Sequence, residues 1–158
     1  MSELDLRGAN FFKMFSMFLV MLSLLYMYGY VDDRMEFLTK SHDWISKTPK
    51  AYFFYFGLGF FALFNLLINV GISMYKRAEG FDENSKLFKN KEQKRKLLVW
   101  FTYFLVGVNV LISCIIFYLA LIRINEVNDR LQYIYIPTIG LVVLLGITVG
   151  LLVAISRK

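Results

Sequence analysis

The chain has 158 residues, of which 58% are hydrophobic and 18% aromatic, and a formal net charge of +6. Soluble domains are typically about 45–50% apolar, and here the excess is gathered into runs long enough to cross a hydrocarbon core of about 30 Å. This pattern excludes an ordinary soluble fold, and it connects the positive charge to membrane topology and lipid headgroups rather than to nucleic acid.

The first apolar run covers residues 14–31 and follows a short polar segment. The run is rich in bulky side chains and is not followed by a small-residue cleavage site, which argues against a signal peptide. Tyr26, Tyr28 and Tyr30 crowd its far end. Because tyrosine rings favour the level of the lipid headgroups, we interpret this run as the first membrane span.

The segment 32–50 carries four basic and four acidic residues and forms the first loop. Apolar residues recur in it at helical spacing, namely Met35, Phe37, Leu38, Trp44 and Ile45. The spacing predicts either an amphipathic helix in the plane of the interface or a helical continuation of the first span into water.

Three further spans are predicted at 51–75, 97–122 and 133–155. Pro49 precedes the second span, where the missing amide proton costs little at a helix start. We therefore predict one membrane domain over residues 1–158. Its fold class is all-α, with four transmembrane helices in an antiparallel bundle.

The loop 76–96 decides the predicted orientation because it holds eight of the eighteen Lys and Arg residues. Together with the two chain ends it holds twelve of the eighteen, so the positive-inside rule places both termini and this loop in the cytoplasm. Low proline content, one cysteine and compact loops favour a bacterial inner (plasma) membrane. The basic residues expected to contact anionic lipid or an acidic cytosolic partner are Lys89, Lys91, Lys94, Arg95 and Lys96.

The central loop also divides the chain into two hairpins of the same orientation. Residues 31–38 resemble 127–134, and 15–20 resemble 101–106, although gaps are needed to align all matches. One interpretation of these matches is a fold built from two repeated helical hairpins, related by an axis along the membrane normal.

Small and polar residues form a stripe along each span, and such stripes bring membrane helices together. Asparagines inside the bilayer are costly unless paired, so we expect them to meet each other, a backbone carbonyl or water. Packing is the first interpretation of these residues, and a polar path for a ligand is the alternative. The candidate residues are Asn65, Asn69, Asn109, Ser113, Gly146 and Gly150.

The sequence predicts no catalytic residue, no cofactor and no metal site. Cys114 is the single cysteine and His42 the single histidine, which excludes an intramolecular disulfide and a bis-histidine haem site within one chain. His42 precedes Asp43, but adjacent side chains rarely face each other usefully, and no nucleophile motif accompanies them. From about residue 14 to 30, and through the middles of the other three spans, there is no Asp, Glu, Lys, Arg or His, which argues against proton-coupled transport.

These features favour a non-enzymatic protein that acts as an accessory, scaffold or assembly subunit of a larger membrane complex. Its expected partners are membrane lipids and other membrane subunits or further copies of itself, without nucleic acid. The alternative is a small oligomeric transporter or channel with an asparagine-lined path. A membrane enzyme is the third and weakest interpretation.

Overall fold

The computed structural model describes residues 3–31, 34–35, 48–77, 91–124 and 130–156. Nearly all of these residues are helical, and the four long helices are α1 (Glu3–Tyr30), α2 (Lys50–Arg77), α3 (Lys91–Ile124) and α4 (Tyr135–Ser156). Within the described residues, each of the four contains a segment long and apolar enough to cross a membrane. The prediction of four such helices is confirmed.

Two helices begin earlier than the predicted spans. Helix α1 begins at Glu3, and its membrane-length segment is Leu6–Tyr30, so Lys13 lies inside the segment instead of before it. Helix α3 begins at Lys91, so its first turns contain Lys91, Lys94 and Arg95, which the sequence places in the central loop. Hydropathy marks only the apolar part of a helix, whereas Lys, Glu, Gln and Arg are strong helix formers that extend it.

Two short strands lie at the two ends of the first loop. Strand β1 (Arg34–Met35) pairs with β2 (Thr48–Pro49) in antiparallel fashion, with Arg34 opposite Pro49. Met35 was expected at the start of an amphipathic segment and instead lies in β1. The rest of that segment, 36–47, lies outside the described residues.

The fourth span is also entered differently from the prediction. A 3-10 turn, η2 (Arg130–Tyr133), precedes α4, which begins at Tyr135 instead of residue 133. Pro137 then lies in the first turn of α4, where its missing amide proton has no helical partner to lose.

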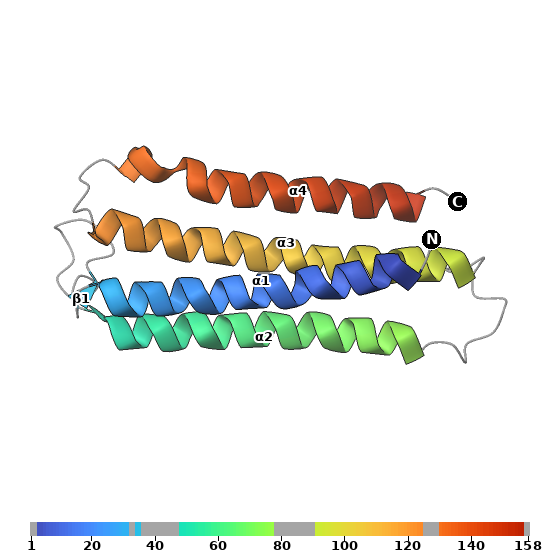
Figure 1. Cartoon of the computed structure of the whole chain (residues 1–158), viewed down its shortest axis with the longest axis horizontal. Coiled ribbons are helices and arrows are strands. Elements are labelled where there is room, and N and C mark those ends of the chain that lie inside the picture. Colours follow the sequence, from blue (N-terminus) through green and yellow to red (C-terminus); the bar gives the residue numbers. More distant parts are fainter. Residues whose placement is uncertain (1–2, 32–33, 36–47, 78–90, 125–129, 157–158) are drawn as a thin grey trace.

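The four helices lie side by side with their long axes roughly aligned, and both chain termini lie at one end of the molecule (Figure 1). Helix α3 packs extensively against α1 and α4, whereas α2 makes smaller contacts with α1 and α3. Helices α2 and α4 therefore form opposite flanks of an open arrangement. The contact between α3 and α4 is much larger than the contact between α1 and α2, so the two predicted hairpins pack differently.

The hydrophobic core lies between α1, α2 and α3. Helix α1 supplies buried side chains at steps of three and four residues, and α3 supplies Ile116 and Ala120. Helix α2 approaches α1 closely at Gly57, where an added Cβ would lie 2.9 Å from Cδ2 of Leu24. The buried residues of this cluster from α1 are Val20, Leu24 and Met27, and Val31 directly follows the helix.

Helix α4 packs on the other side of α3 through glycines. A Cβ at Gly140 would lie 3.0 Å from the backbone Cα of Leu111, and a Cβ at Gly150 would run into the ring of Trp100. Close backbone approach at small residues is a usual way for membrane helices to associate, because lipid offers no hydrophobic driving force between them.

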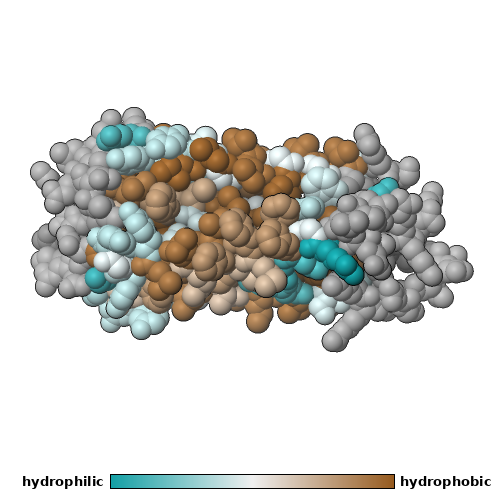
Figure 2. Space-filling model, in the orientation of Figure 1, coloured by the Kyte–Doolittle hydropathy of each residue, from teal (hydrophilic) through white to brown (hydrophobic). Residues whose placement is uncertain are grey.

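The outer surface matches a membrane setting. Figure 2 shows hydrophobic residues across the middle of the face in view and hydrophilic residues toward the two ends. Phe56 of α2 is 73% exposed and Val142 of α4 is 61% exposed. The two flanking helices thus present large apolar side chains outward.

Candidate functional site

A polar network joins three helices in the interior. Asn65 of α2 and Asn109 of α3 form a reciprocal amide pair. Nδ2 of Asn65 donates to Oδ1 of Asn109 at 2.9 Å, and Nδ2 of Asn109 donates to Oδ1 of Asn65 at 3.3 Å. Nδ2 of Asn109 also donates to Oγ of Ser16 in α1 at 3.1 Å. The network therefore holds α1, α2 and α3 together at one level of the bundle.

The side-chain amides of Asn65 and Asn109 donate their N–H groups to other atoms of the protein. Asn109 is fully buried and directs its two amide protons to Ser16 and Asn65. Asn65 is 6% exposed and directs its two protons to Asn109 and to the backbone oxygen of Phe61, the latter at 2.9 Å. The sequence led us to expect another asparagine, a backbone carbonyl or water as partners, and the structure shows the first two.

The network continues along α2 toward the end where the chain termini lie. Nδ2 of Asn69 donates to the backbone oxygen of Asn65 at 2.7 Å, and Nζ of Lys13 donates to Oδ1 of Asn69. Ser16 in turn donates from Oγ to the backbone oxygen of Lys13 at 2.8 Å. The polar chain thus runs from the cation of Lys13, in the first half of α1, to the buried amide pair.

Sequence reasoning missed the role of Lys13, because the first span was taken to begin after it. The signal that could have revealed it is the spacing between Lys13 and Ser16, which places both on one helical face. Lys13 and Asn69 are both partly buried. A lysine inside a membrane helix can keep its stem against apolar side chains while its charged group reaches a polar partner, here Oδ1 of Asn69.

Ser113 lies outside this network. Its Oγ donates to the backbone oxygen of Leu19 at 3.3 Å and so adds a second link between α3 and α1. The bond is side chain to backbone, so it tolerates changes in the Leu19 side chain. Ser113 therefore contributes to helix packing at a separate level.

Gly146 and Gly150 lie four residues apart on α4, as a GxxxG motif, and have different surroundings. Gly150 faces Trp100 of α3, whereas Gly146 is exposed and has nothing within 4 Å of an added Cβ. Gly59 of α2 is exposed and open in the same way. One glycine of the pair thus serves packing within the chain, and the other leaves a small patch of helix backbone accessible from outside.

The basic residues of the central loop are only partly within the described chain. Lys91, Lys94 and Arg95 lie in the first turns of α3. Lys96 follows them and its side chain is exposed. Lys89 and His42 lie outside the described residues.

Comparison of the chain with protein-family models, with curated proteins and with solved structures finds no match. Within the described residues, no group of three or more His, Cys, Asp or Glu side chains could hold a metal ion. The amide pair contains no ionisable group, so its chemistry is hydrogen bonding alone. What the arrangement can do is fix the relative positions of three membrane helices.

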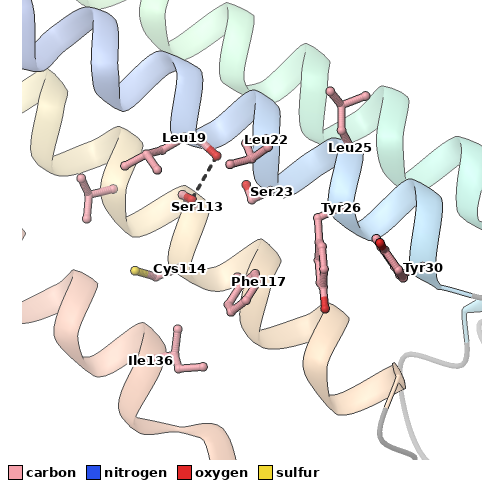
Figure 3. Close-up of a pocket in the computed structure, with 11 residues that line it drawn as sticks. Leu19, Leu22, Ser23, Leu25, Tyr26, Tyr30, Ser113, Cys114, Phe117 and Ile136 are labelled. Atoms are coloured by element: carbon pink, nitrogen blue, oxygen red, sulfur yellow. Dashed lines mark hydrogen bonds between the residues drawn. The ribbon is translucent and has the colours of Figure 1, made fainter.

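A pocket of about 660 Å³ lies on a different face, between α1 and α4 with α3 as its floor (Figure 3). Stripes of small residues did not reveal it, because it arises from how α1 and α4 are spaced on α3. The residues that line it are Leu19, Leu22, Ser23, Leu25, Tyr26, Tyr30, Val110, Ser113, Cys114, Phe117 and Ile136.

Proposed function

We propose that this chain is a non-enzymatic membrane protein that works by association, as an accessory, scaffold or assembly subunit of a larger membrane complex. The observation that carries the proposal is the outward surface of the flanking helices. Gly59 and Gly146 leave backbone open on α2 and α4, next to exposed apolar side chains. Small residues of this kind allow a neighbouring membrane helix to approach closely. The partner is another membrane subunit or a second copy of the chain.

The polar network favours a protein that works by association over a transporter or channel with a polar path. Asn65 and Asn109 direct their amide protons to protein atoms, and Asn109 is fully buried. The alternative is a small oligomeric transporter or channel with a path lined by asparagines. That function would require the amide pair to open so that a solute could replace its hydrogen bonds.

The proposal includes an antiparallel four-helix bundle in a bacterial inner membrane, with both termini and the central loop in the cytoplasm. It is supported by the position of the charged helix ends. The Arg77 end of α2 and the Lys91 end of α3 lie at the same end of the molecule as both termini (Figure 1). An excess of basic residues on one side is what orients membrane proteins toward the cytoplasm. The orientation is tested by fusing reporters to each terminus. One reporter is active only in the cytoplasm and the other only outside it.

The central experiment is purification of the tagged chain in mild detergent, followed by mass spectrometry of what remains bound. We expect unlike membrane subunits at a fixed ratio. A clean homo-oligomer that moves a solute across liposomes would overturn the accessory function in favour of the alternative. Leucine variants of Asn69 and Asn109 refine the test, because partner loss without loss of transport supports association and the reverse supports a path.

Variants of the open glycines test the surface itself. We expect Gly146→Leu and Gly59→Leu to reduce partner recovery while leaving the chain folded, since nothing within the chain lies within 4 Å of either added Cβ. The matched control is Val142→Leu, a change on the exposed face of α4 that leaves no glycine altered. Equal partner recovery from all three variants would show that the flanking helices do not form the interface.

A further inference from the structure

The pocket between α1 and α4 exists because both helices pack extensively against α3 and scarcely against each other. Its walls are α1 and α4, and its floor is the stretch of α3 that carries Ser113, Cys114 and Phe117 (Figure 3). A volume of about 660 Å³ is within the usual range of small-molecule sites, about 300–1,000 Å³. The pocket is open to the outside of the bundle, so a molecule from the surrounding membrane that enters it gains dispersion contacts with the lining atoms.

The lining selects an apolar occupant. None of the eleven lining residues is charged. The hydroxyl of Ser23 donates to the backbone oxygen of Val20 at 2.8 Å, and that of Ser113 donates to the backbone oxygen of Leu19 at 3.3 Å. These hydroxyl protons are therefore already used, and a polar ligand would lose its own hydrogen bonds on entering.

The length of the pocket separates a lipid chain from a partner helix. Its α1 wall extends from Leu19 to Tyr30, which is about 16 Å at the rise of an α-helix. This is about half the thickness of a hydrocarbon core of about 30 Å, so the pocket has the depth of one leaflet. A partner helix would need a groove along the whole core, whereas an acyl chain needs only one leaflet.

The end of the pocket that Tyr26 and Tyr30 line is suited to the boundary between acyl chains and lipid headgroups. The ring centroids of Tyr26 and Tyr30 lie 4.9 Å apart, and that of Tyr26 lies 5.3 Å from that of Phe117 on α3. Tyr30 is 71% exposed at the end of α1. Tyrosines at this position place their rings against acyl chains and their hydroxyl groups near lipid headgroups.

From these observations we infer that the pocket binds one acyl chain of a membrane phospholipid, taken from the leaflet at the Tyr30 end, with the headgroup beside Tyr26 and Tyr30. The chain would pass along α3 toward Leu19 and contact Cys114 and Phe117. The inference does not depend on the association proposed above, because it concerns a face between α1 and α4 and not the outward glycines of α2 and α4.

Photolabelling tests the site. The full chain is reconstituted into vesicles of phosphatidylethanolamine and phosphatidylglycerol that contain a phospholipid with a diazirine on one acyl chain. After irradiation, we expect adducts concentrated on the peptides that carry residues 19–26 and 110–117. We expect Leu22→Trp to reduce these adducts at least five-fold, because the larger ring fills the pocket. The matched control is Leu145→Trp, at an exposed position of α4 outside the pocket, which should label like the unchanged chain.

A second variant and a second measurement distinguish a loss of lipid binding from a folding defect. Ile136→Trp fills the pocket from the α4 side and should also reduce labelling. Cys114 is the single cysteine of the chain, so its reaction with a maleimide in detergent should slow when phospholipid is added. The inference is overturned if adducts spread evenly over α2 and α4, if both filled variants label normally, if only a free fatty acid labels the pocket, or if a protein cross-links there instead.

Discussion

Replacing Asn109 by leucine removes the centre of the polar network while keeping a side chain of similar size. The change deletes both hydrogen bonds of the amide pair and the bond to Ser16. It also leaves one Nδ2 proton and the Oδ1 atom of Asn65 without the hydrogen-bond partners that Asn109 supplies. The expected result is a lower free energy of unfolding.

The magnitude follows from measured membrane hydrogen bonds, which average about 0.6 kcal/mol and reach about 1.7 kcal/mol. Three such bonds give an expected destabilisation of about 2 kcal/mol for Asn109→Leu. The amide pair contributes two of them, so Asn65→Leu and Asn109→Leu should show a coupling energy of about 1 kcal/mol in a double-mutant cycle. The double variant should therefore be more stable than the sum of the single changes predicts.

The assay is reversible unfolding in mixed micelles by increasing dodecyl sulfate, followed by circular dichroism. Asn10→Leu supplies the same chemical change at an exposed position of α1 and should alter stability little. If Asn109→Leu unfolds with the same free energy as the unchanged chain, the network does not hold the helices together. If the two single changes add without coupling, the amide pair described above is not formed in the protein.

Three further predictions concern other contacts. Gly150→Leu should cost about 1–3 kcal/mol of stability by forcing the Trp100 ring away, whereas Gly146→Leu should cost little, and equal effects in the unfolding assay would contradict the packing of α4. Lys50→Met should lower stability by about 0.5–1 kcal/mol, because the lysine donates to the backbone oxygen of Val31 at 3.3 Å and lies over the ring of Tyr28; an unchanged unfolding curve would refute this. Neutralising the central basic cluster should weaken partner recovery or disturb the orientation reported by terminal fusions, and unchanged results in both would leave the loop as a plain connector. The residues changed together are Lys89, Lys91, Lys94, Arg95 and Lys96.

The asparagines of the polar network could be chosen from the sequence, but the particular atoms that they bond could not. Asn65 and Asn109 stand out because an amide inside an apolar run is costly unless paired. Nothing in the spacing says that Asn109 also reaches Ser16, since that contact depends on how far α1 is shifted along α3. The spacing of Gly146 and Gly150 likewise indicates one motif in the sequence. Their different surroundings in the structure depend on the rotation of α4.

The sequence by itself determined four helices of membrane length, because hydropathy and helix length act along a single segment and need no partner. It did not determine where α1 and α3 begin, since strong helix formers extend a helix beyond its apolar part. Only the tertiary structure decided that α2 and α4 are flanks, that Lys13 reaches Asn69, and that a pocket lies between α1 and α4. Lipid-facing and protein-facing apolar residues are chemically alike, so the choice of neighbours depends on the fit of surfaces from different helices, which no single segment contains.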